Sequence, residues 1–111
     1  MTDLAATFVP VARSHHIAEG ALFGTVLGDQ SIVLGRLDGV LYALDGACSH
    51  QGAPLCDGEL DGATLICPLH NGAFDLRTGA PERLPVDTPI ARYAVREEDG
   101  VVLIAPPSAL S

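Results

Sequence analysis

The chain has 111 residues, of which 48% are hydrophobic, enough for one compact domain but too few for two. Its formal net charge of −8, with only six scattered basic residues, argues against a nucleic-acid partner. No apolar run approaches the roughly 20 residues that span a bilayer, and no basic and then apolar leader is present, so we expect no membrane partner and a cytoplasmic location.

Short apolar stretches predict antiparallel strands in the first part of the chain. They cover residues 23–27, 31–37 and 40–44, and Gly28-Asp29 and Asp38-Gly39 separate them. Because Asp and Gly tolerate positive φ angles, such pairs are typical of the tight turns of β-hairpins. The only helical period is a weak one over residues 16–21.

The pattern changes between about residues 45 and 85, an insert that carries all three cysteines. Its apolar pieces, residues 64–66 and 73–76, are short, so we expect loops there and no core. Strand patterns return at 90–96 and 101–105, on either side of Asp99-Gly100. The sequence predicts an all-β fold with a single domain over 1–111, built from a base at approximately 1–44 and 86–106 and this insert.

The insert places a cysteine close to a histidine twice, at Cys48 and His50 and again at Cys67 and His70. An odd number of cysteines disfavours a disulfide framework, and thiolate with imidazole suits zinc, copper or iron–sulfur centres. Zinc fingers usually pair like ligands, whereas both pairs here are mixed. Mixed pairs suit a two-iron centre with two cysteines on one iron and two histidines on the other, and a mononuclear zinc site is the alternative.

The residues around these pairs carry a resemblance to the Rieske ferredoxin family, over about residues 40–105. The motif from Cys48 to Gly79 reads CSHQGAPLCDGELDGATLICPLHNGAFDLRTG. The resemblance implies one [2Fe–2S] cluster per chain, with Cys48 and Cys67 on the inner iron and His50 and His70 on the outer iron. It also implies the Rieske fold, stacked antiparallel sheets in a β-sandwich-like arrangement of three sheets, with a cluster-binding loop subdomain.

Residues beside the ligands bear on the reduction potential of the cluster. High-potential members of the family carry hydroxyl groups two and four residues after the last histidine and a disulfide between the loops. This chain has Gly72 and Phe74 at those two positions, and Leu69 replaces the second bridging cysteine. We therefore expect a potential near the lower end of the Rieske range, roughly −150 mV.

Several further residues carry expectations about the site. We expect Gly52 and Gly72, just after the histidines, to let the backbone approach the cluster sulfides. Residues 83–85 resemble the family's third loop, which covers the cluster. We expect Cys56 to be a buried thiol that packs as a small hydrophobe, and the adjacent His15 and His16 to be solvated surface residues.

The resemblance implies an electron-transfer component, not an enzyme. The chain is similar to the ferredoxins of bacterial dioxygenase systems of aromatic hydrocarbon catabolism. Such ferredoxins pass electrons from a flavoprotein reductase to a terminal Rieske non-haem iron oxygenase. The large catalytic domain that follows the oxygenase's own Rieske domain has no counterpart here. A nitrite-reductase small-subunit-like protein and a zinc-binding structural or interaction module are the two alternatives.

Overall fold

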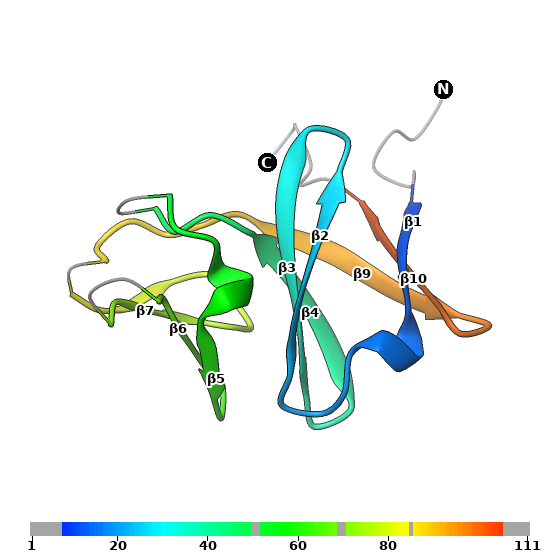
Figure 1. Cartoon of the computed structure of the whole chain (residues 1–111), viewed down its shortest axis with the longest axis horizontal. Helices are drawn as coiled ribbons and strands as arrows, with labels where there is room; N and C mark the ends of the chain where they lie inside the picture. The colour runs from blue at the N-terminus through cyan, green and yellow to red at the C-terminus, as the bar shows by residue number, and fades with distance from the viewer. Residues whose placement is uncertain (1–7, 50–51, 69–70, 85, 106–111) are drawn as a thin grey trace.

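The computed structural model describes residues 8–49, 52–68, 71–84 and 86–105. Strands in these ranges pair antiparallel in two sheets, one of order β1-β10-β9-β4-β3-β2 and one of order β5-β6-β7-β8 (Figure 1). The strands are β1 Val9–Arg13, β2 Leu22–Leu27, β3 Gln30–Leu37, β4 Val40–Asp45, β5 Glu59–Asp61, β6 Thr64–Ile66, β7 Ala73–Asp75, β8 Pro81–Arg83, β9 Arg92–Glu98 and β10 Val101–Ala105, and two 3-10 turns are η2 Ser14–His16 and η3 Leu55–Asp57. The all-β Rieske-type fold is confirmed, although the described residues form two sheets and not three.

The predicted hairpins are present, with strand ends within about two residues of those expected. Residues 22–45 form the meander β2-β3-β4, and β9 pairs with β10. At Asp38-Gly39 the φ angles are 54° and 79°, and at Asp99-Gly100 they are 54° and 79°. Two consecutive positive φ angles define the type I′ turn, whose twist matches that of the flanking strands.

The six-stranded sheet folds over on itself to enclose a core. Among the described residues, strand pairing joins its two halves where Ala43 and Leu44 of β4 face β9. On the opposite side the edge strands approach each other, since Thr25 Oγ1 donates a hydrogen bond to the Val11 carbonyl at 3.0 Å. The enclosed core draws buried residues from both halves and from the segment between β1 and β2: Ile17, Ile32, Leu34, Leu41, Ala43, Tyr93, Val102 and Ile104. This sandwich is the base that supports the insert.

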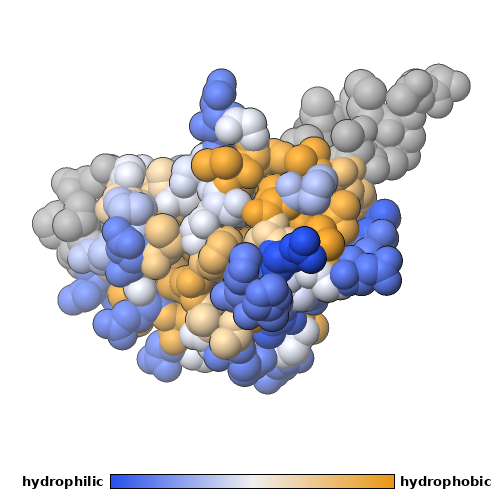
Figure 2. Space-filling view, turned by 45° about the vertical axis from the view of Figure 1, so that its right-hand side comes forward, coloured by the Kyte–Doolittle hydropathy of each residue, from blue (hydrophilic) through white to orange (hydrophobic). Residues whose placement is uncertain are grey.

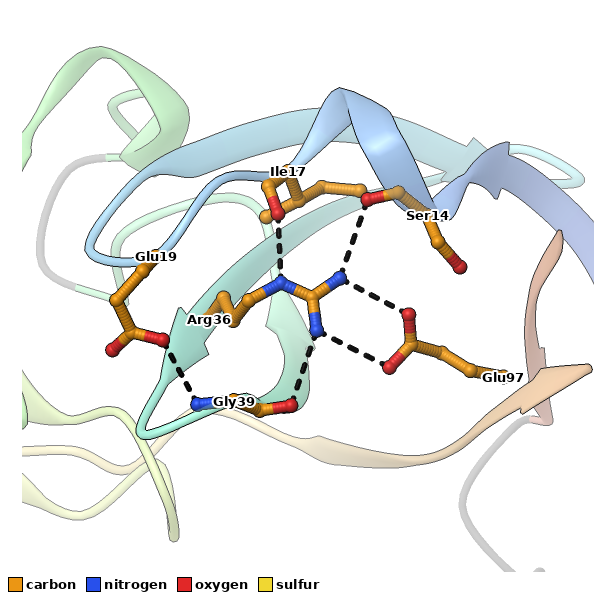
Figure 3. A network of polar contacts seen from close by, with 6 residues as sticks. All are labelled: Ser14, Ile17, Glu19, Arg36, Gly39 and Glu97. Atoms are coloured by element: carbon orange, nitrogen blue, oxygen red, sulfur yellow. Dashed lines mark hydrogen bonds and ion pairs between the residues drawn. The ribbon is translucent and has the colours of Figure 1, made fainter. Parts of the chain in front are cut away.

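Arg36 of β3 ties three separate segments of the base together (Figure 3). Its guanidinium donates to the carbonyls of Ser14, Ile17 and Gly39 and to both carboxylate oxygens of Glu97 in β9, at 2.7–3.3 Å. The Arg36 side chain is only 15% exposed. Beyond η2, residues 17–21 contain a bend and a turn but no helix, so the weak helical period over 16–21 corresponds to no α-helix.

The four-stranded sheet of residues 59–83 packs around buried side chains of its own, which corrects the expectation of an insert without core. Leu55, Leu65, Phe74 and Leu76 are each fully buried, in one cluster with Val33 and Leu44 of the base. The apolar pieces of the insert are short because each strand spans only three residues. These apolar pieces bury one another only after the sheet forms, and the pattern of residues along the sequence does not show this mutual burial.

On the face that Figure 2 shows, apolar residues gather in a patch at the upper part of the base, and hydrophilic residues border that patch. An open hollow of about 470 Å³ lies between β1 and β2 and is lined by base residues, among them His16 and Phe23. Its lining includes no residue of the insert, so the hollow is separate from the candidate site. The described part of the chain contains no helix long and apolar enough to cross a membrane.

Candidate metal centre

The two cysteines of the predicted ligand set lie at equivalent places in the fold. Cys48 follows β4 and Cys67 follows β6, each just beyond the end of its strand. They are 4% and 2% exposed and belong to the same buried cluster, together with Phe74 and Val86. The structure thus brings both thiols into one apolar environment. His50 and His70 lie outside the described residues, so their place in the site stays a prediction.

Each cysteine opens a loop that a backbone hydrogen bond closes in the same way. The Cys48 amide donates to the Ala53 carbonyl at 2.9 Å, and the Cys67 amide donates to the Gly72 carbonyl at 2.7 Å. Residues 48–53 and 67–72 are therefore two loops of equal length, each with one candidate histidine inside it. We call them the ligand loops. Their similarity fits a centre that takes one thiolate and one imidazole from each loop.

The two glycines of the ligand loops are required for different reasons. Gly52 has a φ of 73°, and its amide donates to the Cys48 carbonyl at 2.7 Å. Gly72 needs no positive φ, but a Cβ there would collide with the Val86 side chain. Left-handed backbone at Gly52 and close packing at Gly72 thus explain both residues without the approach to sulfide that the sequence suggested.

A third segment, residues 83–90, lies against both ligand loops. The Ser49 hydroxyl donates to the Thr88 carbonyl at 2.6 Å, and the Arg83 guanidinium donates to the Asn71 carbonyl at 3.1 Å. The sequence suggested a covering loop at 83–85, of which Pro85 lies outside the described residues. It gave no signal for Ser49 or Thr88, because these residues are 39 positions apart and belong to no local pattern.

Asp45, the last residue of β4, connects the strand before the first ligand loop to the residues that follow the third segment. Its carboxylate accepts hydrogen bonds from the Tyr93 hydroxyl at 2.7 Å, the Ala91 amide at 3.0 Å and the Gln30 side chain at 3.2 Å. Burial of the phenol, and then its hydrogen bond and proximity to the Asp45 carboxylate, raise the pKa of Tyr93 far above its usual range. Tyr93 therefore stays a neutral donor at any physiological pH.

Cys56 does not behave as predicted. It lies in η3 and is exposed, not buried, with its Sγ 4.0 Å from Asp57 Oδ1 and close to Gly24 of β2. The 3-10 turn directs the neighbouring Leu55 inward and leaves Cys56 at the surface. Sequence reasoning failed here because a single apolar residue in a short turn gives no periodicity.

The histidines outside the motif are exposed, as expected. His15 and His16 contact each other edge to face with ring centroids 4.5 Å apart, and His16 stacks on Phe23 at 5.6 Å. Within the described ranges, which omit His50 and His70, no three Cys, His, Asp or Glu side chains are grouped to hold a metal ion. The donor chemistry that the structure does bring together, two buried thiols at the heads of equivalent loops, fits the cysteine half of a two-iron centre.

Comparison with known proteins gives the same assignment. The model of the Rieske [2Fe-2S] domain matches residues 7–94. The ferredoxin component of the naphthalene 1,2-dioxygenase system of Pseudomonas aeruginosa is 37% identical over 97 residues, which cover 87% of this chain and 93% of that protein. Relatives of this kind are electron carriers of dioxygenase systems and not catalytic enzymes.

Solved structures agree with the relatives. The ferredoxin of carbazole 1,9a-dioxygenase from Nocardioides aromaticivorans IC177 superposes with a TM-score of 0.86 at 33% identity, covering 92% of this chain and all of that one. A chain from a complex of reduced oxygenase and oxidized ferredoxin in carbazole 1,9a-dioxygenase gives a TM-score of 0.82 at 28% identity, covering 93% and 94% of the two chains. With two buried cysteines heading equal loops on this fold, the chain belongs to the Rieske [2Fe-2S] domain family.

Proposed function

We propose that this protein is a one-electron carrier that passes electrons from a flavoprotein reductase to a terminal Rieske non-haem iron dioxygenase. The observation that carries the proposal is the pair of buried cysteines, Cys48 and Cys67, at the heads of two equivalent loops in a Rieske-family chain. Relatives named as ferredoxin components support it, and so does the solved ferredoxin–oxygenase complex.

In this proposal the chain holds one [2Fe–2S] cluster. Cys48 and Cys67 bind the inner iron, and His50 and His70 bind the outer iron. When bound, the cluster accepts and releases single electrons. The chain itself keeps water from the thiolates, which are 4% and 2% exposed. The insert spans about residues 45–85 of a single domain over 1–111.

The proposed potential is low for a Rieske centre. Gly72 and Phe74 bring no hydroxyl to the cluster. Without such donors the more negative, reduced cluster gains less stabilisation. Protein-film voltammetry is expected to give a midpoint of roughly −150 mV, and a value above zero would contradict this part of the proposal.

The ligand assignment has a direct test with a matched control. Purified protein is expected to contain two iron and two acid-labile sulfide per chain and to give a Rieske electron paramagnetic resonance signal after reduction. His70→Ala is expected to lose that signal, whereas His16→Ala, which removes an exposed histidine of the base, keeps it. Protein that contains zinc and no sulfide would instead establish the zinc-module alternative.

The carrier role is tested by reconstitution. Added to a cognate reductase and oxygenase, the protein is expected to raise NADH-dependent turnover in proportion to its concentration, and no effect would refute the role. Stable co-purification with a large reductase subunit would favour the nitrite-reductase alternative. For the cell, we propose a cytoplasmic location, which fractionation of the native host would test.

A further inference from the structure

The segment between β8 and β9 is fixed at both ends and in the middle. The Val86 amide donates to the Arg83 carbonyl at 3.1 Å, which forms a turn directly after β8. At the other end the Ile90 amide donates to the Gly79 carbonyl at 3.0 Å. Val86 and Ile90 are 3% and 7% exposed. The segment is therefore packed against the core and is not a free surface turn.

Its contact with the first ligand loop falls beside one candidate ligand. Ser49 lies between Cys48 and His50, and its hydroxyl donates to the Thr88 carbonyl at 2.6 Å. A serine side chain is short, so this bond restricts the backbone of Ser49 itself, the residue that precedes His50 in the sequence. No other side-chain hydrogen bond joins this loop to the third segment among the residues that the structure describes.

Its contact with the second ligand loop falls beside the other candidate. The Arg83 guanidinium donates to the Asn71 carbonyl at 3.1 Å, and Asn71 directly follows His70. Asn71 has a left-handed φ of 58°, a conformation that costs a non-glycine residue free energy unless its surroundings hold it. Val86 packs against Gly72 in the same loop so closely that a Cβ would not fit. Arg83 and Val86 therefore hold Asn71 and Gly72, the two residues that follow His70 in the sequence.

We propose that residues 83–88 form a brace across the two ligand loops, in which Ser49 and Arg83 are positioning residues for the two histidine ligands. The inference rests on the proposed function, since it takes His50 and His70 as ligands. Each hydrogen bond alone is exposed and weak. However, Ser49 directly precedes His50, Asn71 directly follows His70, and the buried Val86 lies between Arg83 and Thr88 in the same segment. Groups that orient metal ligands in this way change metal affinity by about 10- to 100-fold when they are removed.

The test uses two variants of the holoprotein, Ser49→Ala and Arg83→Gln. Two properties are measured: the g-values of the reduced cluster by electron paramagnetic resonance, and the rate of loss of visible absorption in excess EDTA. We expect altered g-values in both variants and a rate of cluster loss about tenfold above that of the parent protein. The g-values report the surroundings of the irons, which a merely structural contact elsewhere in the insert does not change.

The chain offers a matched control for each variant. Thr64→Val removes an exposed hydroxyl bond, of 3.1 Å to Glu82, within the same four-stranded sheet. Arg92→Gln removes a guanidinium bond, of 3.3 Å to the Arg77 carbonyl, together with one positive charge. Both controls are expected to keep the parent g-values and rate of cluster loss.

Conservative variants keep the test decisive if Ser49→Ala or Arg83→Gln folds poorly. Ser49→Thr and Arg83→Lys retain a donor long enough to reach the carbonyl, which the amide of the shorter glutamine side chain in Arg83→Gln is not, and both are expected to lie within about twofold of the parent rate. Parent-like behaviour of Ser49→Ala and Arg83→Gln overturns the brace, as do equal changes in the controls or conservative variants as damaged as the deletions. A parent protein without a Rieske signal would refute the proposed function itself, and with it this inference.

Discussion

Gly72 is the residue of the second ligand loop that packs directly against Val86 of the third segment. A Cβ at this position would overlap the Val86 side chain, and Val86 is 3% exposed with no room to retreat. We expect Gly72→Ala to lower the free energy of unfolding by about 1–3 kcal/mol, as overpacking in a tight core does. Urea unfolding of the holoprotein measures the effect.

The cause of that loss can be isolated with a second substitution. Val86→Ala removes the methyl groups that the new Cβ would meet, so the double variant is expected to be more stable than the sum of the two single changes predicts, by about 1 kcal/mol or more. Strictly additive losses would show that Gly72 is needed for some reason other than contact with Val86.

Tyr93 gives the molecule a specific sensitivity to alkali. Its pKa is raised in the folded state by burial and by Asp45, whereas in the unfolded chain it titrates near 10. Between these two values the unfolded state releases a proton that the folded state keeps, so stability falls as pH rises. The contribution is complete below about pH 10 and is lost above it, at up to about 1.4 kcal/mol per pH unit.

Tyr93→Phe separates this effect from general alkaline unfolding. The variant lacks the bond to Asp45, so it is expected to be less stable at neutral pH by about 1.5–3 kcal/mol, the usual value for a hydrogen bond to a charged group. Its free energy of unfolding should also fall less steeply between pH 10 and 11.5. Denaturant titrations at several pH values measure both quantities, and equal slopes for the two proteins would contradict the assignment.

Local patterns account for which site residues the sequence could predict. Cys48 and Cys67 could be predicted as ligands because each lies two or three positions from a histidine, and glycines flank both pairs. The contact of Ser49 with Thr88 was missed because it joins distant parts of the chain. Cys56 was wrongly expected to be buried, since the direction of a side chain in a short 3-10 turn depends on what packs against the turn.

At the scale of elements, Arg36 connects parts of the base that strand pairing does not join. β3 and β9 are not neighbours in the sheet, yet the Arg36 guanidinium binds Glu97 and the segment that leads from β1 to β2 (Figure 3). Its hydrogen bond holds the pKa of Glu97 below its usual range, against a smaller opposing effect of burial. Five acceptor contacts by one planar group are beyond the reach of lysine.

Arg36→Lys is therefore expected to lower the free energy of unfolding by about 1.5–3 kcal/mol at neutral pH. The matched control is Arg77→Lys, because the Arg77 side chain is 55% exposed and its Nε lies 3.7 Å from Asp75, so its loss should cost close to nothing. Because the lowered Glu97 pKa stabilises the fold only above the unfolded value, the difference should shrink as pH falls below about 4. A difference that does not change with pH would contradict this.

Elements were predicted where they are long and paired with a neighbour in sequence. The strands of the β2-β3-β4 meander and of the β9-β10 hairpin satisfy both conditions. β1 was missed because it contains Pro10 and pairs with β10 from the far end of the chain. β5 and β8 were missed because each spans three residues, too few to show alternation.

At the scale of the whole molecule, charge and shape together make a prediction about partner encounter. The chain carries a net charge of −8 and extends 43 Å along its longest axis. The insert with the third segment lies at one end, and the β9-β10 turn lies at the other (Figure 1). Because the Debye length is about 10 Å at 0.1 M salt, charges at the far end are screened from a partner docked at the insert.

Asp87 and Asp99 give a matched pair of single charges for this test, since both are exposed and belong to the third segment and to the β9-β10 turn, respectively. If partners with basic surfaces dock at the insert, the second-order rate of reduction by the reductase should fall about tenfold between roughly 50 and 500 mM salt. Asp87→Asn should lower the rate at low salt about twofold and flatten its salt dependence, whereas Asp99→Asn should leave both within error. Stopped-flow kinetics measure the rates. A larger effect of Asp99→Asn would place the docking surface on the base. Electrons would then have to travel through the protein to reach the insert.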